Sequence, residues 1–175
     1  MRLYFIRHGE SESNYGELIT GQQDVPLTEH GRDQATLAGK QIVEQGIQID
    51  HIISSPLKRA HNTAKLIAAE IGYPELSIVI NEAVIERSFG SLEGTPNNLG
   101  AKLTDELIQQ SGGELDPHIR ERAQAFLESI KGTEGSVLVV SHTGFGRRLR
   151  AVVQNIPTEQ SDNFKNAELT DLGEI

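Results

Sequence analysis

The sequence has no cysteine, and it has no long hydrophobic run. Without cysteine the chain forms no disulfide, uses no thiolate as a nucleophile and binds no zinc or iron–sulfur cluster through sulfur. No stretch approaches the length of a membrane span, and the apolar residues near the N-terminus are too few for the core of a signal peptide. These absences predict a cytoplasmic protein with no membrane partner.

An excess of positive charge is also missing. The formal net charge is −9 and the sequence pI is about 5.1, which argues against nucleic acid or an anionic membrane as a partner. A small anionic substrate stays compatible with this balance, because salt screens charges over ~8 Å and a local basic pocket decides what binds. The length of 175 residues suits a single domain, residues 1–175, with one core. Oligomeric state is not indicated.

Two short apolar segments run into residues that are unusual at the end of a buried strand. Residues 3–6 (LYFI) lead directly into Arg7 and His8, and residues 137–140 (VLVV) lead toward His142. Both segments are continuous apolar runs, as expected for strands that are covered on both faces. Charged and titratable groups at their ends indicate a site there.

Helix signals alternate with strand signals along the chain. Residues 51–54 (HIIS) are a third strand candidate, with Ser55 as the expected N-cap and Pro56 as the first residue of a helix that ends at Gly72. The other expected elements are helices at 29–45 (N-cap Thr28), 98–110, 116–131 and 145–154, a strand at 77–80 and a weak strand at 167–169.

This alternation predicts an α/β protein, namely a three-layer α/β/α sandwich with a mainly parallel central sheet. The helices expected at 98–110 and 116–131 lie between the fourth strand candidate and the VLVV strand. They are predicted to form a small helical cap, an insertion at about residues 81–131.

Ligands of open parallel sheets bind outside the carboxyl ends of the strands. By this rule Arg7 and His8, Arg59 in the first turn of the helix after residues 51–54, and His142 meet at one rim. Two guanidinium groups and two imidazoles, close to helix N-termini that favour anions, predict a phosphate pocket.

With these motifs the sequence resembles the histidine phosphatase superfamily, the phosphoglycerate mutase-like proteins. The resemblance covers residue 1 to about residue 150, and it is specific in combination although each motif alone is weak. The matching residues are Arg7-His8-Gly9-Glu10-Ser11 with Asn14, Thr20-Gly21, Pro26-Leu27-Thr28 leading to Gly31, Ser54-Ser55-Pro56-Leu57 with Arg59-Ala60, Thr63-Ala64, Glu86 in IERSFGSLEG and His142 in VVSHTGF. Thr143 departs from the family pattern, which has two glycines after the second histidine.

His8 is predicted to be the nucleophile. A neutral imidazole nitrogen attacks phosphorus and carries it as phosphohistidine, which divides one difficult displacement into two easier ones. Arg7 and Arg59 suit the phosphoryl oxygens, because a guanidinium group stays charged and presents a planar fork. Their charges also oppose protonation of His8 beside the phosphate dianion.

The resemblance implies the remaining roles. His142 would donate to the phosphate, and Glu86 would protonate the leaving group and later accept a proton from water. The other expected substrate contacts are Asn14, Thr20, Gly21 and the backbone of Thr143. The reaction so implied needs no metal and no cofactor.

Other residues of the same types lie near these in the sequence or elsewhere in the chain. Glu82 and Glu93 are near Glu86 in sequence, and only the family register selects Glu86; Glu93 is interpreted as a loop-capping carboxylate. Arg147 is either a support of the pocket through the backbone or a surface charge. The remaining histidines are interpreted as structural or exposed, namely His30, His51, His61 and His118.

The leading hypothesis is a metal-independent phosphatase that hydrolyses a small phosphorylated metabolite through phosphohistidine. A phosphoglycerate mutase, which returns the phosphoryl group to bound substrate, is the alternative enzyme. A phosphate-binding module without catalysis is a third hypothesis, and His8 with Glu86 argues against it because binding needs neither a nucleophile nor an acid. The sequence leaves the physiological substrate open.

Overall fold

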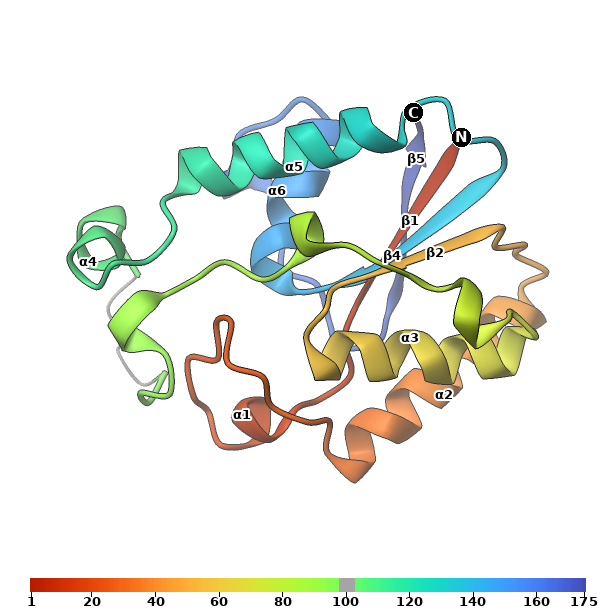
Figure 1. Cartoon of the computed structure of the whole chain (residues 1–175), viewed down its shortest axis with the longest axis horizontal. Helices are drawn as coiled ribbons and strands as arrows, with labels where there is room; N and C mark the ends of the chain where they lie inside the picture. Colours follow the sequence, from red (N-terminus) through yellow and green to blue (C-terminus); the bar gives the residue numbers. More distant parts are fainter. Residues whose placement is uncertain (98–102) are drawn as a thin grey trace.

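The computed structural model describes residues 1–97 and 103–175. A five-stranded sheet in the order β3-β2-β4-β1-β5 runs through the centre (Figure 1). β5 pairs antiparallel with β1, and the other neighbours are parallel. The prediction of an α/β protein with a mainly parallel sheet is confirmed. The strands are β1 (Arg2–Arg7), β2 (His51–Ser54), β3 (Val79–Ile80), β4 (Ser136–Ser141) and β5 (Leu169–Glu174).

Two pairs of helices cover the two faces of the sheet (Figure 1). One face packs against α2 (Glu29–Glu44) and α3 (Lys58–Ile71), and the other packs against α5 (Asp116–Ile130) and α6 (Thr143–Val153). The short helices α1 (Glu12–Tyr15) and α4 (Asp105–Gln110) lie outside these layers (Figure 1). Short 3₁₀ turns are η1 (Glu75–Ser77), η2 (Glu82–Val84), η3 (Gly90–Leu92) and η4 (Thr158–Gln160).

The alternation of side chains along β1 builds both cores. Leu3 and Phe5 point toward α5 and α6, whereas Tyr4 and Ile6 point toward α2 and α3. This is the two-residue period of a strand that is buried on both faces. Burial of each large side chain contributes about 1.5–3 kcal/mol, so the strand that ends at the site is firmly held.

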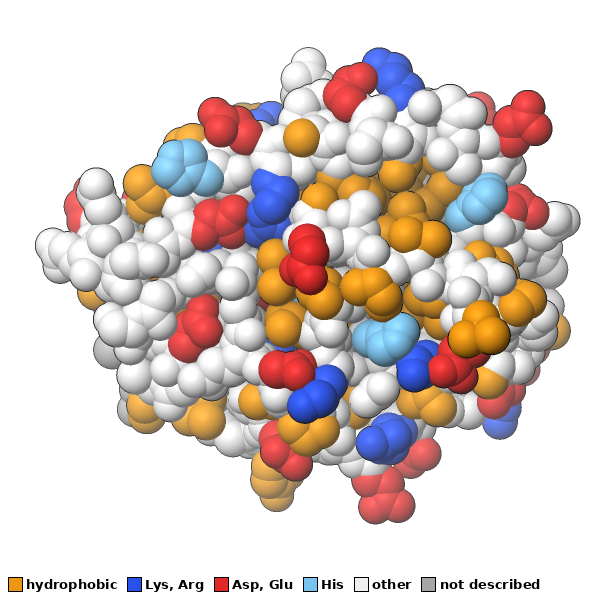
Figure 2. Space-filling model, in the orientation of Figure 1, with side chains coloured by type: hydrophobic (Ala, Val, Ile, Leu, Met, Phe, Trp, Pro, Cys, Tyr) orange, Lys and Arg blue, Asp and Glu red, His pale blue; other side chains and the backbone are white. Residues whose placement is uncertain are grey.

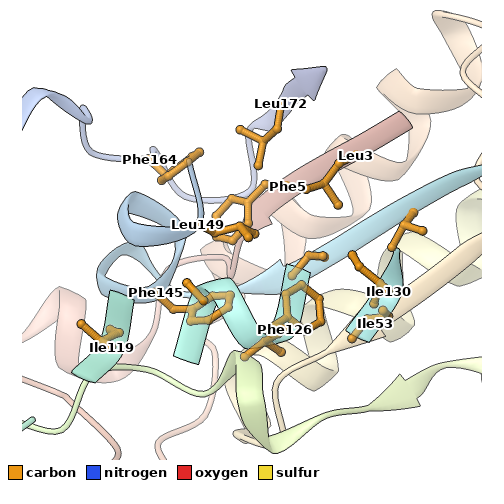
Figure 3. Packing of buried hydrophobic residues seen from close by; sticks show 14 residues of the cluster. Leu3, Phe5, Ile53, Ile119, Phe126, Ile130, Phe145, Leu149, Phe164 and Leu172 are labelled. Atoms are coloured by element: carbon orange, nitrogen blue, oxygen red, sulfur yellow. The ribbon is translucent and has the colours of Figure 1, made fainter. Parts of the chain in front are cut away.

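The core between the sheet and α5 is rich in aromatic side chains (Figure 3). Phe126 of α5 and Phe145 of α6 meet edge to face, with ring centroids 5.9 Å apart. Phe145 directly follows the residues that begin α6, so this packing fixes the N-terminal turn of that helix. α5 therefore belongs to the layer that covers the sheet, and not to the side cap predicted at about residues 81–131.

Two helices begin at other residues than predicted. α3 begins at Lys58 with Leu57 as its N-cap, so Ser55 does not cap it and Pro56 precedes it. The Ser55 hydroxyl accepts from the Leu57 N–H and also contacts His142. Ser55 and Pro56 therefore form a turn before the helix, and the helix itself begins at Lys58. α6 begins at Thr143 rather than at residue 145.

Three further predicted boundaries also shift. The helix expected at 98–110 is described only as α4, since residues 98–102 lie outside the described part. β5 begins at Leu169 because Ala167 has a positive φ of 51°, which interrupts extended pairing. β3 begins at Val79 because η1 occupies the residues before it.

The predicted N-cap of α2 is confirmed, since the Thr28 side chain accepts from the Gly31 N–H.

Acidic and basic side chains are interspersed on the face shown in Figure 2, and no large patch of one sign lies there. Among the helices that the structure describes, none is long and apolar enough to cross a membrane.

Candidate active site

The predicted site residues gather at the carboxyl end of the parallel strands. β1 ends at Arg7, β2 leads into Ser55, and β4 leads into His142. β4 lies between β1 and β2 in the sheet, so the three strand ends are neighbours. The topology thus brings together residues that are far apart in the sequence, as predicted from the rule for open parallel sheets.

His8 is buried and its ring is held by two contacts. Nδ1 lies 2.6 Å from the carbonyl oxygen of Gly9, and Nε of Arg59 lies 3.2 Å from Nε2. A carbonyl only accepts and a guanidinium only donates. Nδ1 therefore carries the proton and Nε2 carries the lone pair, which is the form that a nucleophilic imidazole requires.

Electrostatics keep His8 neutral. Burial holds the pKa of His8 well below its ordinary value, and the charges of Arg59 and Arg7 lower this pKa further. Nε2 is therefore unprotonated at neutral pH.

Arg59 is almost completely buried in the first turn of α3. Its Nη2 donates to the carbonyl of Gly21 over 2.7 Å, and its Nη1 donates to the carbonyl of Gln23 over 2.6 Å. Burial lowers the pKa of Arg59 to about 10, so the group keeps its charge at neutral pH. These bonds fix the guanidinium beside His8.

Arg7 is the second fixed cation. Its Nη1 donates to the carbonyl of Phe164 over 3.0 Å, while its buried Nε has no partner among the residues that the structure describes. Burial lowers the pKa of Arg7, and the Glu86 carboxylate acts in the opposite direction.

His142 is buried beside His8, with ring centroids 5.1 Å apart. Its Nε2 lies 2.8 Å from the hydroxyl oxygen of Ser55. Its buried Nδ1 has no partner within the described part of the chain. Burial holds the pKa of His142 well below its ordinary value, and the charge of Arg59 contributes in the same direction. The sequence predicts Ser55 to be a helix cap within a family motif and gives no signal of this contact.

Glu86 is held at the N-terminus of α6. Gly144 N–H donates to Oε2 and Phe145 N–H to Oε1, both over 3.0 Å, and Arg87 N–H donates to Oε1 over 2.8 Å. Oε1 thus accepts twice and Oε2 once, which leaves Oε2 with more unused hydrogen-bonding capacity toward a ligand. A Cβ on Gly144 would lie only 2.3 Å from Oε1 of Glu86, so this close approach requires glycine.

The two rival carboxylates have other surroundings. Glu82 lies in η2, and Oε1 of Glu93 accepts from the Phe89 N–H over 2.9 Å. Glu93 is therefore a loop-capping carboxylate, as interpreted from the sequence. Glu93 also lies against Gly21, where an added Cβ would be 2.2 Å from Oε1 of Glu93. Gly21 has a positive φ of 51° as well, so both the close approach and the backbone conformation favour glycine there.

A cavity of about 150 Å³ joins these groups. It is lined by every predicted site residue except His142, which is buried beside His8. The Asn14 Oδ1 accepts from the Ser11 N–H and from Asn166 Nδ2, so the amide NH₂ is the group that Asn14 offers to a ligand. The lining residues are Arg7, His8, Asn14, Leu18, Ile19, Thr20, Gly21, Arg59, Glu86, Phe89, Asn97, Leu103 and Thr143.

Asn166, in the segment before β5, is a site neighbour that sequence reasoning missed. Its Nδ2 donates to the carbonyl of His8 over 2.8 Å and lies 3.4 Å from Asn14 Oδ1. The same segment supplies the Phe164 carbonyl that binds Arg7, and Ala167 N–H donates to the carbonyl of Arg7. It therefore braces the end of β1 from outside the matched motifs.

The remaining candidates lie outside the catalytic cavity. Arg147 donates to the carbonyls of Ser161 and Thr158, so it holds the segment after α6 and lines a neighbouring cavity. None of the other histidines lines the catalytic cavity. Within residues 1–97 and 103–175, no cluster of three or more His, Asp or Glu side chains is arranged to hold a metal ion.

An α/β sandwich with two histidines and two arginines at the carboxyl ends of its parallel strands defines the phosphoglycerate mutase-like class of proteins. The chain belongs to the histidine phosphatase superfamily (branch 1), whose family model matches residues 3–174.

Relatives with this fold include mutases and phosphatases. The chain is 31% identical over 180 residues to the 2,3-bisphosphoglycerate-dependent phosphoglycerate mutase of Bartonella bacilliformis. The aligned region covers 90% of this chain and 84% of the relative. The structure is similar to a mycobacterial glucosyl-3-phosphoglycerate phosphatase in complex with VO3, with a TM-score of 0.81, 25% identity and coverage of 97% and 91% of the two chains. It is also similar to a putative alpha-ribazole-5'-P phosphatase of Escherichia coli, with a TM-score of 0.81, 26% identity and coverage of 98% and 89%.

Proposed function

We propose that this protein is a metal-independent phosphatase that hydrolyses a small phosphate monoester through a phosphohistidine on His8. The observation that carries the proposal is the ring of His8, in which Nδ1 donates to Gly9 and the lone pair of Nε2 lies beside Arg59. A histidine needed only for binding would not require this tautomer, a lowered pKa and two cations at once.

In the first step, Nε2 of His8 attacks phosphorus and the bond from phosphorus to the ester oxygen breaks. Arg7 and Arg59 stabilise the charge on the phosphoryl oxygens, and His142 contributes through its ring nitrogen. Protonated Glu86 gives its proton to the departing oxygen, so that the alcohol leaves neutral. The products of this step are the free alcohol and phosphohistidine.

In the second step, water attacks the phosphohistidine and Glu86 accepts one of its protons. The bond from phosphorus to Nε2 breaks, inorganic phosphate forms and His8 returns to its neutral state. Glu86 is then protonated again and ready for the next cycle. The two steps use the same groups in opposite directions.

The proposal is tested by rapid acid-free quenching during turnover of a ³²P-labelled monoester. We expect label bound to His8 that is stable in alkali and lost in acid, and no label on the His8→Ala variant. His118 is exposed and lies outside the cavity, so His118→Ala is the matched control and should label like the wild type. An unlabelled wild type, with a His8→Ala rate equal to that of the wild type, would reject the mechanism. Phosphate binding without turnover on a broad ester panel would instead support a binding module.

A phosphoglycerate mutase is the second candidate, and the mutase relative from Bartonella favours it. A mutase uses the same first step but returns the phosphoryl group to bound substrate instead of water. Interconversion of 2- and 3-phosphoglycerate, measured together with phosphate release, gives the ratio of transfer to hydrolysis. A ratio well above one would replace the phosphatase proposal by the mutase.

A further inference from the structure

Thr143 places a buried hydroxyl at the junction of two cavities. Its Oγ1 is buried and has no hydrogen-bond partner among the residues that the structure describes. Thr143 lines the catalytic cavity with His8 and Arg59, and it also lines a neighbouring cavity of about 440 Å³. A buried hydroxyl without a partner destabilises the protein that contains it, and such groups usually have a specific reason to be there. A bound molecule in either cavity could supply the missing partner.

The position of Thr143 relative to Glu86 identifies which part of the substrate lies nearby. Thr143 directly precedes Gly144 and Phe145, whose N–H groups hold the Glu86 carboxylate over 3.0 Å. A proton donor must contact the oxygen of the leaving group. Thr143 lines both cavities together with Glu86, so a leaving group in contact with Glu86 would lie close to Thr143.

The neighbouring cavity continues in the same direction. Glu86, Phe89, Leu103 and Thr143 line both cavities, whereas His8 lines only the catalytic one. A leaving group that passes Glu86 would thus extend into the second cavity.

The charges of this second cavity favour a neutral polar leaving group. Two of its arginines are paired with carboxylates, Arg87 with Asp105 and Arg148 with Asp116. The third, Arg147, donates to two backbone carbonyls, and the Glu86 carboxylate lines the same cavity. Positive and negative side chains are thus present in equal number, so the cavity offers hydrogen-bonding groups more than an excess of charge.

On the basis of the proposed phosphatase function, we propose that the Thr143 hydroxyl donates a hydrogen bond to a hydroxyl of the leaving group. The enzyme then prefers phosphate esters of polyols to esters of plain alcohols. This makes Thr143 a specificity-determining residue through its side chain, beyond the backbone contact expected from the sequence.

Two esters with the same carbon skeleton test this preference. Glycerol 2-phosphate carries a hydroxyl on each carbon next to the ester carbon, and isopropyl phosphate carries none. Thr143→Val removes the hydroxyl and keeps the shape, and Thr143→Ser keeps the hydroxyl. We expect Thr143→Val to lower the ratio of kcat/KM for glycerol 2-phosphate to kcat/KM for isopropyl phosphate about tenfold, the value of one hydrogen bond. Thr143→Ser should keep the preference of the wild type.

Thermal unfolding separates this role from a structural one. Removal of an unpartnered buried hydroxyl should leave the Tm of Thr143→Val equal to or above that of the wild type. A lower Tm, an equal loss of kcat/KM for both esters, or no loss for either would overturn the inference. If the wild type releases no phosphate from any ester, the proposed function fails on its own. The calorimetric affinities of the two esters for wild type and Thr143→Val then decide the role of the hydroxyl.

Discussion

Arg59 donates from Nε to Nε2 of His8 over 3.2 Å, so a fixed cation touches the nitrogen predicted to attack phosphorus. The rest of the guanidinium is bound to two carbonyls of the loop before α2. This contact orients the lone pair of Nε2, and the charge of Arg59 lowers the pKa of His8 beyond the effect of burial.

The first prediction concerns the shape of that cation. Arg59→Lys keeps a positive charge, but one ammonium group cannot reach His8 and both loop carbonyls together. We expect kcat/KM for a phosphate monoester to fall by about 10²–10³, the range for loss of one preorganised donor. Arg32→Lys is the control, because Arg32 is exposed and should keep the wild-type rate. A loss of only a few-fold at Arg59 would contradict the geometry.

The second prediction concerns stability and pH. His8 and His142 have lowered pKa values in the folded protein because both are buried, whereas in the unfolded chain they titrate near pH ~6.5. Below that pH the unfolded state binds more protons than the folded state, so the free energy of unfolding decreases as the pH falls. Above pH ~6.5 both histidines are neutral in both states, so their titration no longer changes the free energy of unfolding. Each histidine contributes a slope approaching about 1.4 kcal/mol per pH unit.

Urea unfolding at several pH values between roughly 5 and 7.5 measures this effect. The His142→Gln variant should lose less stability on acidification than the wild type, and the variant at exposed His118, His118→Gln, serves as control. Parallel curves for the wild type and His142→Gln would show that His142 is not the titrating group.

The convergence of Arg7, His8, Arg59 and His142 could be predicted from sequence because it depends on topology alone. Strands of continuous apolar residues, each followed by a helix signal, imply a parallel sheet, and a parallel sheet places their ends together. The position of Glu86 could not be derived in this way. It depends on the amides that begin α6, and α6 begins before the predicted residue.

The contacts that escaped prediction depend on side-chain orientation. The sequence predicts Ser55 to be a helix cap, and only the fold shows its hydroxyl at His142. Asn166 lies in a segment without periodicity, which gives no signal of its contact with His8. The pattern of α5 predicts a buried face but does not say what covers it, and in the structure the sheet does.

The third prediction concerns Asn166. Asn166→Asp replaces the Nδ2 donor by an acceptor that faces the His8 carbonyl and Asn14 Oδ1, so a hydrogen bond becomes a repulsion. We expect the free energy of unfolding to fall by about 1 kcal/mol and kcat to fall about tenfold, because the backbone of His8 is no longer held. Exposed Asn163 provides the control, Asn163→Asp, with both quantities unchanged. Equal kinetics for the two variants would mean that the brace is not needed for catalysis.

The fourth prediction concerns Gly144. The Cβ of Gly144→Ala would lie 2.3 Å from Oε1 of Glu86, so the carboxylate must leave its place. Loss of a positioned proton donor reduces the rate by about 10²–10⁴ when the leaving oxygen is basic. A phenyl ester with a nitro group departs as a stable anion and needs this proton much less. The variant should therefore lose far more activity on an alkyl phosphate than on p-nitrophenyl phosphate.

The matched control for this variant is Gly16→Ala. Gly16 has a φ of −79°, and an added Cβ there would lie 3.3 Å from the Glu12 carbonyl oxygen. This overlap is far smaller than the one at Gly144 and does not involve Glu86, so activity on both esters should stay near the wild-type level. The ratio of the two rates separates proton donation from a general disturbance of the site. An equal loss of Gly144→Ala activity on both esters would indicate that displacement of Glu86 disturbs phosphate binding instead. The proton donor would then have to be sought elsewhere along the cavity.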